Sequence, residues 1–249
     1  MIIYDYQDEI GIITLNRPEK RNALHPELVR QLKTKLSEIR EDNSVKILII
    51  TGAGTTFCAG ADLEYLNDLK DYSLLQNEKD SRDLAELFLM TYEFPKPVVA
   101  AVNGAAIAGG CGLASVCDII VADETNSKFG YSEVRIGFIP AIVSTFLIRK
   151  IGEGMARQLL LSGELISGKR AYEIGLVNYL ENNALSGAIN ISSMWIKNSQ
   201  LSLKMTKEMI ANVANLSVQD AVEYCIALNT ISRTTKDFQN GLNTFLLKK

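Results

Sequence analysis

The chain has 249 residues, of which 47% are hydrophobic and 22% are charged, and its formal net charge is −3 at pH 7. This composition is typical of a folded globular protein and excludes disorder as the main state. The slight acidity argues against nucleic-acid binding, which needs a clustered basic surface. The length suffices for one large domain, or for one domain with an appendage.

Hydrophobic patterns alternate between strand and helix up to about residue 184. Leu28, Leu32, Leu36 and Ile39 recur at helical spacing after Pro26, and they predict an amphipathic helix over residues 26–41. Strands are predicted at residues 10–16, 46–51, 97–103, 118–123 and 176–180. Further helical patterns cover residues 61–72, 80–93, 109–116, 142–151, 155–161 and 171–174. Strands that alternate with helices indicate an α/β fold.

The character of the chain changes after about residue 184. Residues 189–196, 201–213, 218–231 and 238–247 are helical by period, with no strand pattern between them. We therefore expect residues 1–190 to form a core that carries the functional site. Residues 191–249 are then a helical C-terminal region.

Cysteine and histidine usage restricts the chemistry. No C-x-x-C pair occurs, and His25 is the only histidine, so we expect no metal site. Free, buried thiols in a reducing compartment are the expected state of Cys58, Cys111, Cys117 and Cys225. His25 directly precedes a helical pattern, which favours a capping or surface role over catalysis. Catalytic proton transfer then falls to a carboxylate.

The least polar stretch, residues 97–122, is long enough to raise the question of a membrane span. Asn103, Ser115, Asp118 and several glycines interrupt it, so it predicts buried strands and a buried helix, and no membrane segment. The first residues lack the basic region, apolar core and cleavage site of a secretion signal. We therefore expect a cytoplasmic protein.

Two glycine-bearing segments, residues 57–63 and 102–113, place small residues where a helix begins. Neither matches a phosphate loop or a dinucleotide fingerprint. Backbone N–H groups at helix starts lack partners, and without bulky side chains over them they can hold an oxyanion. A carboxylate, Glu133, follows in the segment Phe-Gly-Tyr-Ser-Glu.

In order and spacing, several motifs together resemble the enoyl-CoA hydratase/isomerase (crotonase) superfamily over nearly the whole chain. They are residues 13–24, 57–63, 103–122, 129–140 and 171–177. The resemblance implies a crotonase-like spiral of ββα turns with a C-terminal helical oligomerisation subdomain. It also implies a homo-oligomer, as a trimer or a dimer of trimers. The implied substrate is an acyl-CoA thioester, with coenzyme A as part of the substrate and no separate cofactor.

The same resemblance assigns the site residues. The thioester oxygen sits between the N–H groups of Ala61 and Gly109, and Glu133 matches the later of two acid/base glutamates. Fixed N–H donors of this kind stabilise the negative charge of an enolate-like state. The implied CoA path also includes Ala59, Asp62, Leu63 and Glu64, with Tyr131 as a further substrate-binding candidate. Arg17, Lys20 and Arg21 either meet the CoA phosphates or form a solvated basic face.

One position departs from the hydratase pattern. The earlier glutamate of the family lies three residues after the oxyanion glycine, where this chain has Gly112. One glutamate can still serve hydration if the same water supplies hydroxide and returns the proton. A double-bond shift needs only one base, and some isomerases of the family keep only the later glutamate.

The resemblance therefore implies a hydratase-like lyase that acts on a short or branched 2-enoyl-CoA, with methylglutaconyl-CoA as one candidate substrate. The alternatives are a Δ3-Δ2-enoyl-CoA isomerase and an acyl-CoA binding protein that has lost catalysis.

Overall fold

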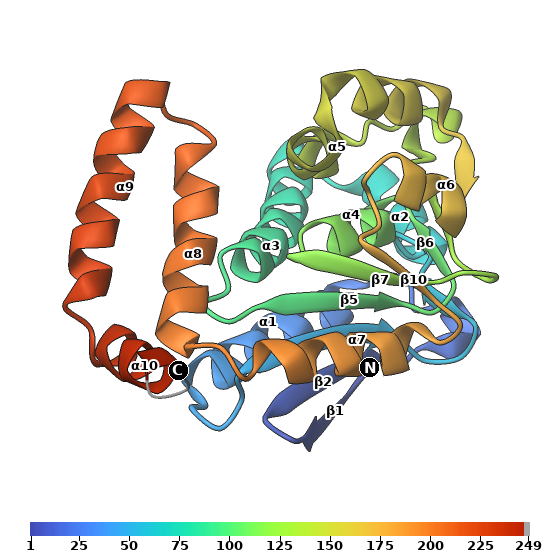
Figure 1. Ribbon diagram of the computed structural model, residues 1–249. Coiled ribbons are helices and arrows are strands. Elements are labelled where there is room, and N and C mark those ends of the chain that lie inside the picture. Colours follow the sequence, from blue (N-terminus) through green and yellow to red (C-terminus); the bar gives the residue numbers. More distant parts are fainter. Residues whose placement is uncertain (247–249) are drawn as a thin grey trace.

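The computed structural model describes residues 1–246, which form two β-sheets surrounded by helices (Figure 1). In these residues the larger sheet has six strands, in the order β1 (Ile2–Gln7), β2 (Ile10–Leu15), β3 (Ile47–Gly52), β5 (Val98–Val102), β7 (Ile119–Asp123) and β10 (Tyr179–Glu181). β1 is antiparallel to β2, and the other neighbours run parallel. The smaller sheet has the order β4 (Thr56–Cys58), β6 (Ala105–Ile107), β8 (Lys128–Gly130) and β9 (Leu165–Ser167).

The helices complete each repeating unit of the fold. The longer ones are α1 (Pro26–Glu41), α3 (Leu74–Tyr92), α5 (Ala141–Ser162), α7 (Ala184–Trp195), α8 (Gln200–Val213), α9 (Val218–Arg233) and α10 (Lys236–Leu246). The shorter ones are α2 (Leu63–Asp68), α4 (Gly109–Ser115) and α6 (Gly168–Glu173), with 3-10 helices η1 (Pro18–Lys20), η2 (Leu69–Asp71) and η3 (Glu133–Ile136). Three times, a strand of the larger sheet is followed by a strand of the smaller sheet and then by helix: β3–β4–α2, β5–β6–α4 and β7–β8–α5. The predicted spiral of ββα turns is confirmed.

Strands at the centre of the larger sheet are buried on both faces. Along β3, Leu48 and Ile50 join the core formed with α1, α3, α4 and α5, whereas Ile47 and Ile49 pack on the side of α7. Successive strand side chains point to opposite faces, so the unbroken apolar run of β3 fits a strand covered on both sides. Each fully buried Leu or Ile contributes about 1.5–3 kcal/mol to folding.

The predicted elements agree with the observed ones where the hydrophobic period is long. The helix over 26–41 has the predicted bounds, and the separate patterns at 142–151 and 155–161 form one helix, α5, that is interrupted by non-helical backbone at Gly152. α3 begins at Leu74, earlier than predicted, because Ser73 and Gln76 form a capping box ahead of it. The predicted helix over 61–72 is divided into α2 and η2.

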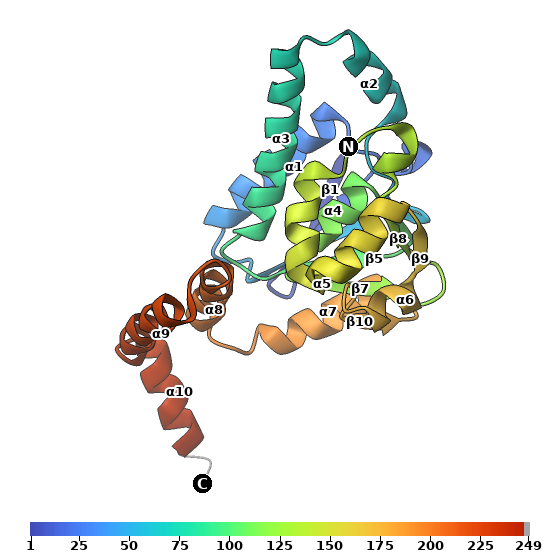
Figure 2. The same cartoon turned by 90° about the horizontal axis from the view of Figure 1, so that it is seen from above.

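α8, α9 and α10 extend away from the two sheets (Figure 2). No residue of α8 or α9 is buried, and their exposed apolar side chains include Ile210, Val222 and Ile226. The expected division between residues 190 and 191 falls inside α7, and the division into a core and an oligomerisation region stays a prediction. Among residues 1–246, no helix combines the length and apolarity needed to cross a bilayer.

Candidate active site

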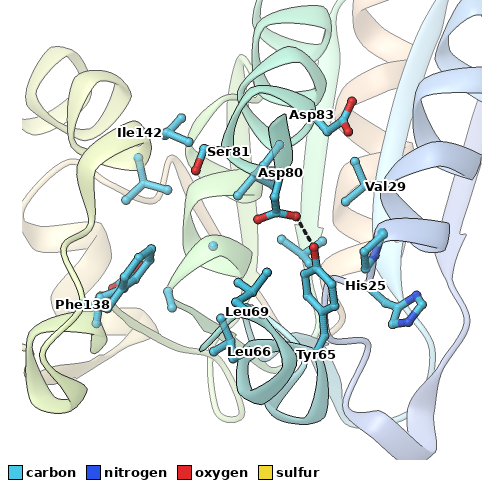
Figure 3. A pocket seen from close by; sticks show the side chains of 18 of the residues that line it. His25, Val29, Tyr65, Leu66, Leu69, Asp80, Ser81, Asp83, Phe138 and Ile142 are labelled. Carbon is cyan, nitrogen blue, oxygen red and sulfur yellow. Dashed lines mark hydrogen bonds between the residues drawn. The ribbon is translucent and has the colours of Figure 1, made fainter. Parts of the chain in front are cut away.

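A cavity of about 1160 Å³ opens between α1, α2, α3 and the segment from η3 to the start of α5 (Figure 3). Two parts of its lining have different origins. The oxyanion corner is formed by Ala61, Gly109 and Glu133, which follow β4, β6 and β8. The α2–α3 wall is formed by side chains of the two helices and of η2, namely Tyr65, Leu66, Leu69, Asp80 and Leu84.

The loop that carries Ala61 is held in place by backbone hydrogen bonds on both sides. The N–H of Leu24 donates to the Gly60 carbonyl at 2.7 Å, and the N–H of Asp62 donates to the Leu24 carbonyl at 3.0 Å. Gly60 has φ +89°, and a Cβ there would lie 2.9 Å from the Ile107 carbonyl oxygen and 3.6 Å from the Gly109 nitrogen. Only glycine fits this position. The Ala61 loop is thereby brought against the start of α4.

The start of α4 is fixed by a strained residue. Ala108 has φ +51°, a conformation that non-glycine residues rarely adopt and that often occurs at functional sites. Its N–H donates to the Gly130 carbonyl at 2.7 Å, which ties α4 to the strand that leads to Glu133. Within residues 1–246, neither the Gly109 N–H nor the Ala61 N–H donates a hydrogen bond to another backbone or side-chain group. Two free donors therefore lie on adjoining loops of one cavity.

Glu133 is the first residue of η3 and lines the same cavity. It is only 8% exposed, and its Oε2 atom has no hydrogen-bond partner among the described residues. Burial raises the pKa of Glu133 above its ordinary value, because the charged form loses its hydration. A carboxyl group of this kind is suited to exchange protons with a substrate or a water molecule.

A side chain at Gly112 would collide with Val143 unless Val143 moved. A Cβ on Gly112 would lie 2.3 Å from Cγ1 of Val143 and 3.2 Å from Cε2 of Phe88. Val143, on α5, itself lines the cavity and fills the place toward which a longer side chain at position 112 would grow. The packing of α5 against this position therefore favours glycine.

Arg17 and Asp62 form a buried ion pair outside the cavity lining. Their Nη2 and Oδ2 atoms are 3.0 Å apart, and the side chains are 11% and 5% exposed. Arg17 also donates to the Ala23 carbonyl at 2.9 Å, while Asp62 accepts from the N–H of Glu64 and caps α2. Both predicted site residues thus hold the Ala61 loop, and the structure does not leave Arg17 free to meet a phosphate.

The other basic candidates are at the surface. Lys20 donates to Glu64 at 2.6 Å, and this hydrogen bond raises the pKa of Lys20. Arg21 is exposed, and its backbone carbonyl oxygen accepts a hydrogen bond from the Ala59 N–H at 3.0 Å. Of the neighbouring candidates, Ala59 and Leu63 line the cavity, whereas Glu64 does not.

Tyr131 lies in the core. It is fully buried, it does not line the cavity, and its hydroxyl oxygen is 2.8 Å from Oγ of Ser115. The structure therefore does not bring Tyr131 together with the other predicted substrate-binding residues.

The predicted capping role of His25 and the predicted burial of three of the four cysteines are confirmed, whereas Cys225 is only partly buried. His25 caps α1, with its Nδ1 atom accepting from the Glu27 N–H at 3.2 Å. Cys58, Cys111 and Cys117 are free and buried, and burial raises the pKa of each to about 12. No cluster of three or more potential metal ligands is found in residues 1–246.

Several lining residues were not predicted from the sequence. Tyr65 donates to Asp80 at 2.5 Å across the gap between α2 and α3 (Figure 3). Phe138 and Ile142 lie on the other side of the cavity in this view. An S-x-x-Q capping signal at Ser73 was available and would have extended α3 toward Asp80, but no pattern in the sequence pairs Tyr65 with Asp80.

A spiral of ββα units that brings two free N–H groups and a buried glutamate to one cavity is the architecture of a crotonase-like acyl-CoA enzyme. The family model described as enoyl-CoA hydratase/isomerase matches residues 5–249. The chain belongs to the enoyl-CoA hydratase/isomerase family.

Similar proteins agree with this assignment. A Thermus thermophilus protein, provisionally named an enoyl-CoA hydratase, is 38% identical over 242 residues, which are 96% of this chain and 95% of the relative. The Escherichia coli 2,3-dehydroadipyl-CoA hydratase is 34% identical over 100% of this chain and 96% of its own length. The crystal structure of enoyl-CoA hydratase from Bacillus anthracis, 31% identical, superposes with a TM-score of 0.93 and covers 100% of this chain and 96% of that one. The predicted enzyme class is confirmed.

Proposed function

We propose that this enzyme adds water to the double bond of a 2-enoyl-CoA thioester, or removes it in the reverse direction, with Glu133 as its only catalytic carboxylate. One observation carries the proposal: the buried carboxyl group of Glu133, whose Oε2 atom has no hydrogen-bond partner among the described residues, lines the same cavity as the free N–H groups of Ala61 and Gly109. The names of the relatives support hydratase chemistry over other reactions of a thioester.

The two N–H groups act on the thioester carbonyl. When hydroxide adds to Cβ, electrons move through Cα to the carbonyl oxygen, which becomes an enolate oxygen. Donors that are already fixed stabilise this charge without rearranging during the reaction. Two backbone hydrogen bonds supply that rigidity. The bond from the Leu24 N–H to the Gly60 carbonyl holds the Ala61 loop, and the bond from the Ala108 N–H to the Gly130 carbonyl holds the start of α4 before substrate arrives.

Glu133 moves the protons. As a carboxylate it takes one proton from a water molecule while the oxygen of that water bonds to Cβ. The resulting carboxylic acid then gives the proton to Cα as the enolate collapses, so that one water is consumed and Glu133 is regenerated. General acid–base catalysis of this type contributes about 10²–10⁴-fold to a rate. The packing of Val143 against Gly112 leaves no place there for a second carboxylate.

We also propose where coenzyme A and further copies of the chain bind. Lys20 and Arg21 are exposed beside the Ala59 loop and are the candidates for contact with the CoA phosphates. The exposed apolar side chains of α8 and α9 are suited to contact further copies of the chain in a trimer or a dimer of trimers. We further propose a cytoplasmic location and no cofactor beyond the CoA of the substrate.

A double-bond shift is the second candidate function. It would use the same two donors and the same glutamate, which would move a proton between Cα and Cγ. The absence of a second catalytic carboxylate near Gly112 favours this candidate relative to a hydratase with two glutamates. The third possibility, binding of acyl-CoA without turnover, is disfavoured by the raised pKa of the buried Glu133, because burying an unpaired carboxyl group costs stability.

A panel of thioesters separates these functions. The purified chain is assayed with crotonyl-CoA for water addition and with 3-hexenoyl-CoA for migration of the double bond, beside a direct CoA-binding measurement. Hydration of crotonyl-CoA supports the proposal, and double-bond migration without hydration supports the isomerase. Binding without either reaction would leave only the binding protein.

A further inference from the structure

The α2–α3 wall contains a carboxylate that no cation neutralises. Asp80, on α3, accepts a hydrogen bond from the Tyr65 hydroxyl on α2, and no Lys or Arg pairs with it among residues 1–246. Both residues line the cavity, where Leu69 and Leu84 are apolar neighbours in the same lining. Figure 3 shows the Asp80 carboxylate between Tyr65 and the opposite side of the cavity, where Ile142 lies.

The cations of the cavity lining are already paired with other acids. Lys33 donates to Asp83 at 3.3 Å and to Glu86 at 2.5 Å, and Lys79 donates to Asp83 at 3.1 Å. Arg30 pairs with Glu27 at 2.6 Å. The Nδ1 atom of His25 accepts a hydrogen bond from the Glu27 N–H. In the described lining, each Lys and Arg side chain therefore already has an acidic partner.

Glu133 adds a second carboxylate without a cationic partner to the same cavity. An acyl chain that ended in a carboxylate would add a third carboxylate without a cationic partner to a space with largely apolar walls. Its desolvation would have no compensating ion pair, and it would be repelled by Asp80 and by the ionised Glu133. A chain that ends in a methyl group meets none of these costs, and Leu69, Leu84 and Phe138 offer it apolar contact.

We infer that the cavity selects acyl groups without a charge at the end remote from the thioester, and that Asp80 is the residue that sets this selectivity. The inference rests on the proposed function, since it assumes that the acyl chain lies against the α2–α3 wall. It separates this chain from its Escherichia coli relative, whose name specifies 2,3-dehydroadipyl-CoA as substrate. It also disfavours methylglutaconyl-CoA, the candidate considered from the sequence, because that acyl group carries a free carboxylate.

The direct test compares two substrates of equal length. 2-Hexenoyl-CoA and 2,3-dehydroadipyl-CoA both have six-carbon acyl chains and differ in ending with a methyl or a carboxylate group. We expect kcat/KM of the unmodified enzyme to be about tenfold or more higher for 2-hexenoyl-CoA, the scale that like-charge repulsion in a partly dry site produces. The Escherichia coli 2,3-dehydroadipyl-CoA hydratase serves as the positive control for the charged substrate. Equal values for the two substrates would overturn the inference.

Two matched variants assign the effect to one side chain. Asp80→Asn keeps the shape of the residue and removes its charge, and it is expected to raise the ratio of kcat/KM for the charged over the uncharged substrate about tenfold. Glu78→Gln removes the same charge from the same helix, but Glu78 pairs with Arg82 outside the cavity lining and should leave that ratio unchanged. A ratio that shifts equally in both variants, or in neither, would refute the role of Asp80.

The outcomes also separate this inference from the proposed function. If neither thioester is hydrated, and crotonyl-CoA is not hydrated either, the proposed function fails. If both six-carbon thioesters are hydrated at equal rates, the proposed function stands and the selectivity inference fails.

Discussion

The oxyanion corner and the α2–α3 wall line one cavity, but they are built from different parts of the chain. The corner depends on backbone atoms, whose positions follow from hydrogen bonds between loops and from a glycine at φ +89°. The wall depends on side chains of two helices, joined by the hydrogen bond between Tyr65 and Asp80. The two donors of the corner are therefore main-chain groups that any residue but proline supplies, whereas the surface of the wall changes with each side chain that forms it. The proposed function assigns the reaction to the corner, and the further inference assigns selectivity to the wall.

The largest expected effect is in the corner. Glu133→Gln should lower kcat about 10²–10⁴-fold for every acyl group tested, because the proton carrier is lost whatever chain is bound. Steady-state kinetics with crotonyl-CoA and 2-hexenoyl-CoA measure it. Glu153→Gln, which removes an exposed carboxylate paired with Arg157, is the control and should leave kcat unchanged. A loss confined to one substrate would mean that Glu133 belongs to selectivity.

Removing the ion pair that holds the Ala61 loop should also lower the free energy of unfolding. Arg17→Met leaves Asp62 buried without its cation, and breaking a buried ion pair in this way costs about 3–5 kcal/mol of unfolding free energy. Lys20→Met breaks an exposed pair and should cost no more than about 1 kcal/mol. Denaturant unfolding of both variants gives the two values. Similar costs for both would show that the Arg17–Asp62 pair does not hold the Ala61 loop.

A smaller effect is expected where the corner meets α5. Gly112→Glu should destabilise the fold by about 1–3 kcal/mol, the usual cost of overpacking, because its side chain collides with Val143. The double variant Gly112→Glu, Val143→Ala makes room and should recover part of this loss. Thermal unfolding measures both. If the single variant is as stable as the parent, the packing of Val143 does not explain the glycine.

The smallest effect is the dependence on pH. Burial raises the pKa of Glu133 above 4.5, the ordinary value for glutamate, so kcat/KM should fall with decreasing pH at a higher pH than for an exposed carboxylate. Stability should change with pH in the opposite direction to kcat/KM. A pKa raised in the folded state means that the proton is bound more tightly there, so Glu133 contributes less stability as pH rises through its folded pKa.

Glu133→Gln should then be more stable than the parent at neutral pH, and the difference should shrink as the pH falls toward 4.5. Thermal unfolding at a series of pH values measures this. A Gln variant that is less stable than the parent at pH 7 would contradict the claim that burial of the Glu133 carboxylate costs stability.

Much of the fold could be predicted from the sequence because its long elements have clear periods. The helix over 26–41 and the buried strands at 10–15, 47–52 and 98–102 follow from apolar spacing alone. The strands β4, β6, β8 and β9 have three residues each, too few for a period to show. The spiral was predicted through motifs that share an order with a known family, and not through the strands themselves.

The residues of the site also differ in whether the sequence predicts them. Ala61, Gly109 and Glu133 were predicted through the motifs that this chain shares with the family, and the fold brings all three to one cavity. Their catalytic roles stay predictions. Arg17 and Tyr131 lie in matching motifs, yet one is used in a buried ion pair and the other in the core. A motif places a residue near the site but does not say toward which side it points. The Tyr65–Asp80 pair joins two helices, and no local pattern encodes it.

The central claim is that the N–H groups of Ala61 and Gly109 hold the reacting oxygen. A crystal structure of the enzyme with a non-reactive acyl-CoA, such as butyryl-CoA, tests it directly. The account predicts the thioester oxygen about 2.7–3.1 Å from both nitrogens, with the acyl carbons beside the Glu133 carboxylate. A thioester oxygen bound elsewhere, with both N–H groups facing solvent, would contradict it.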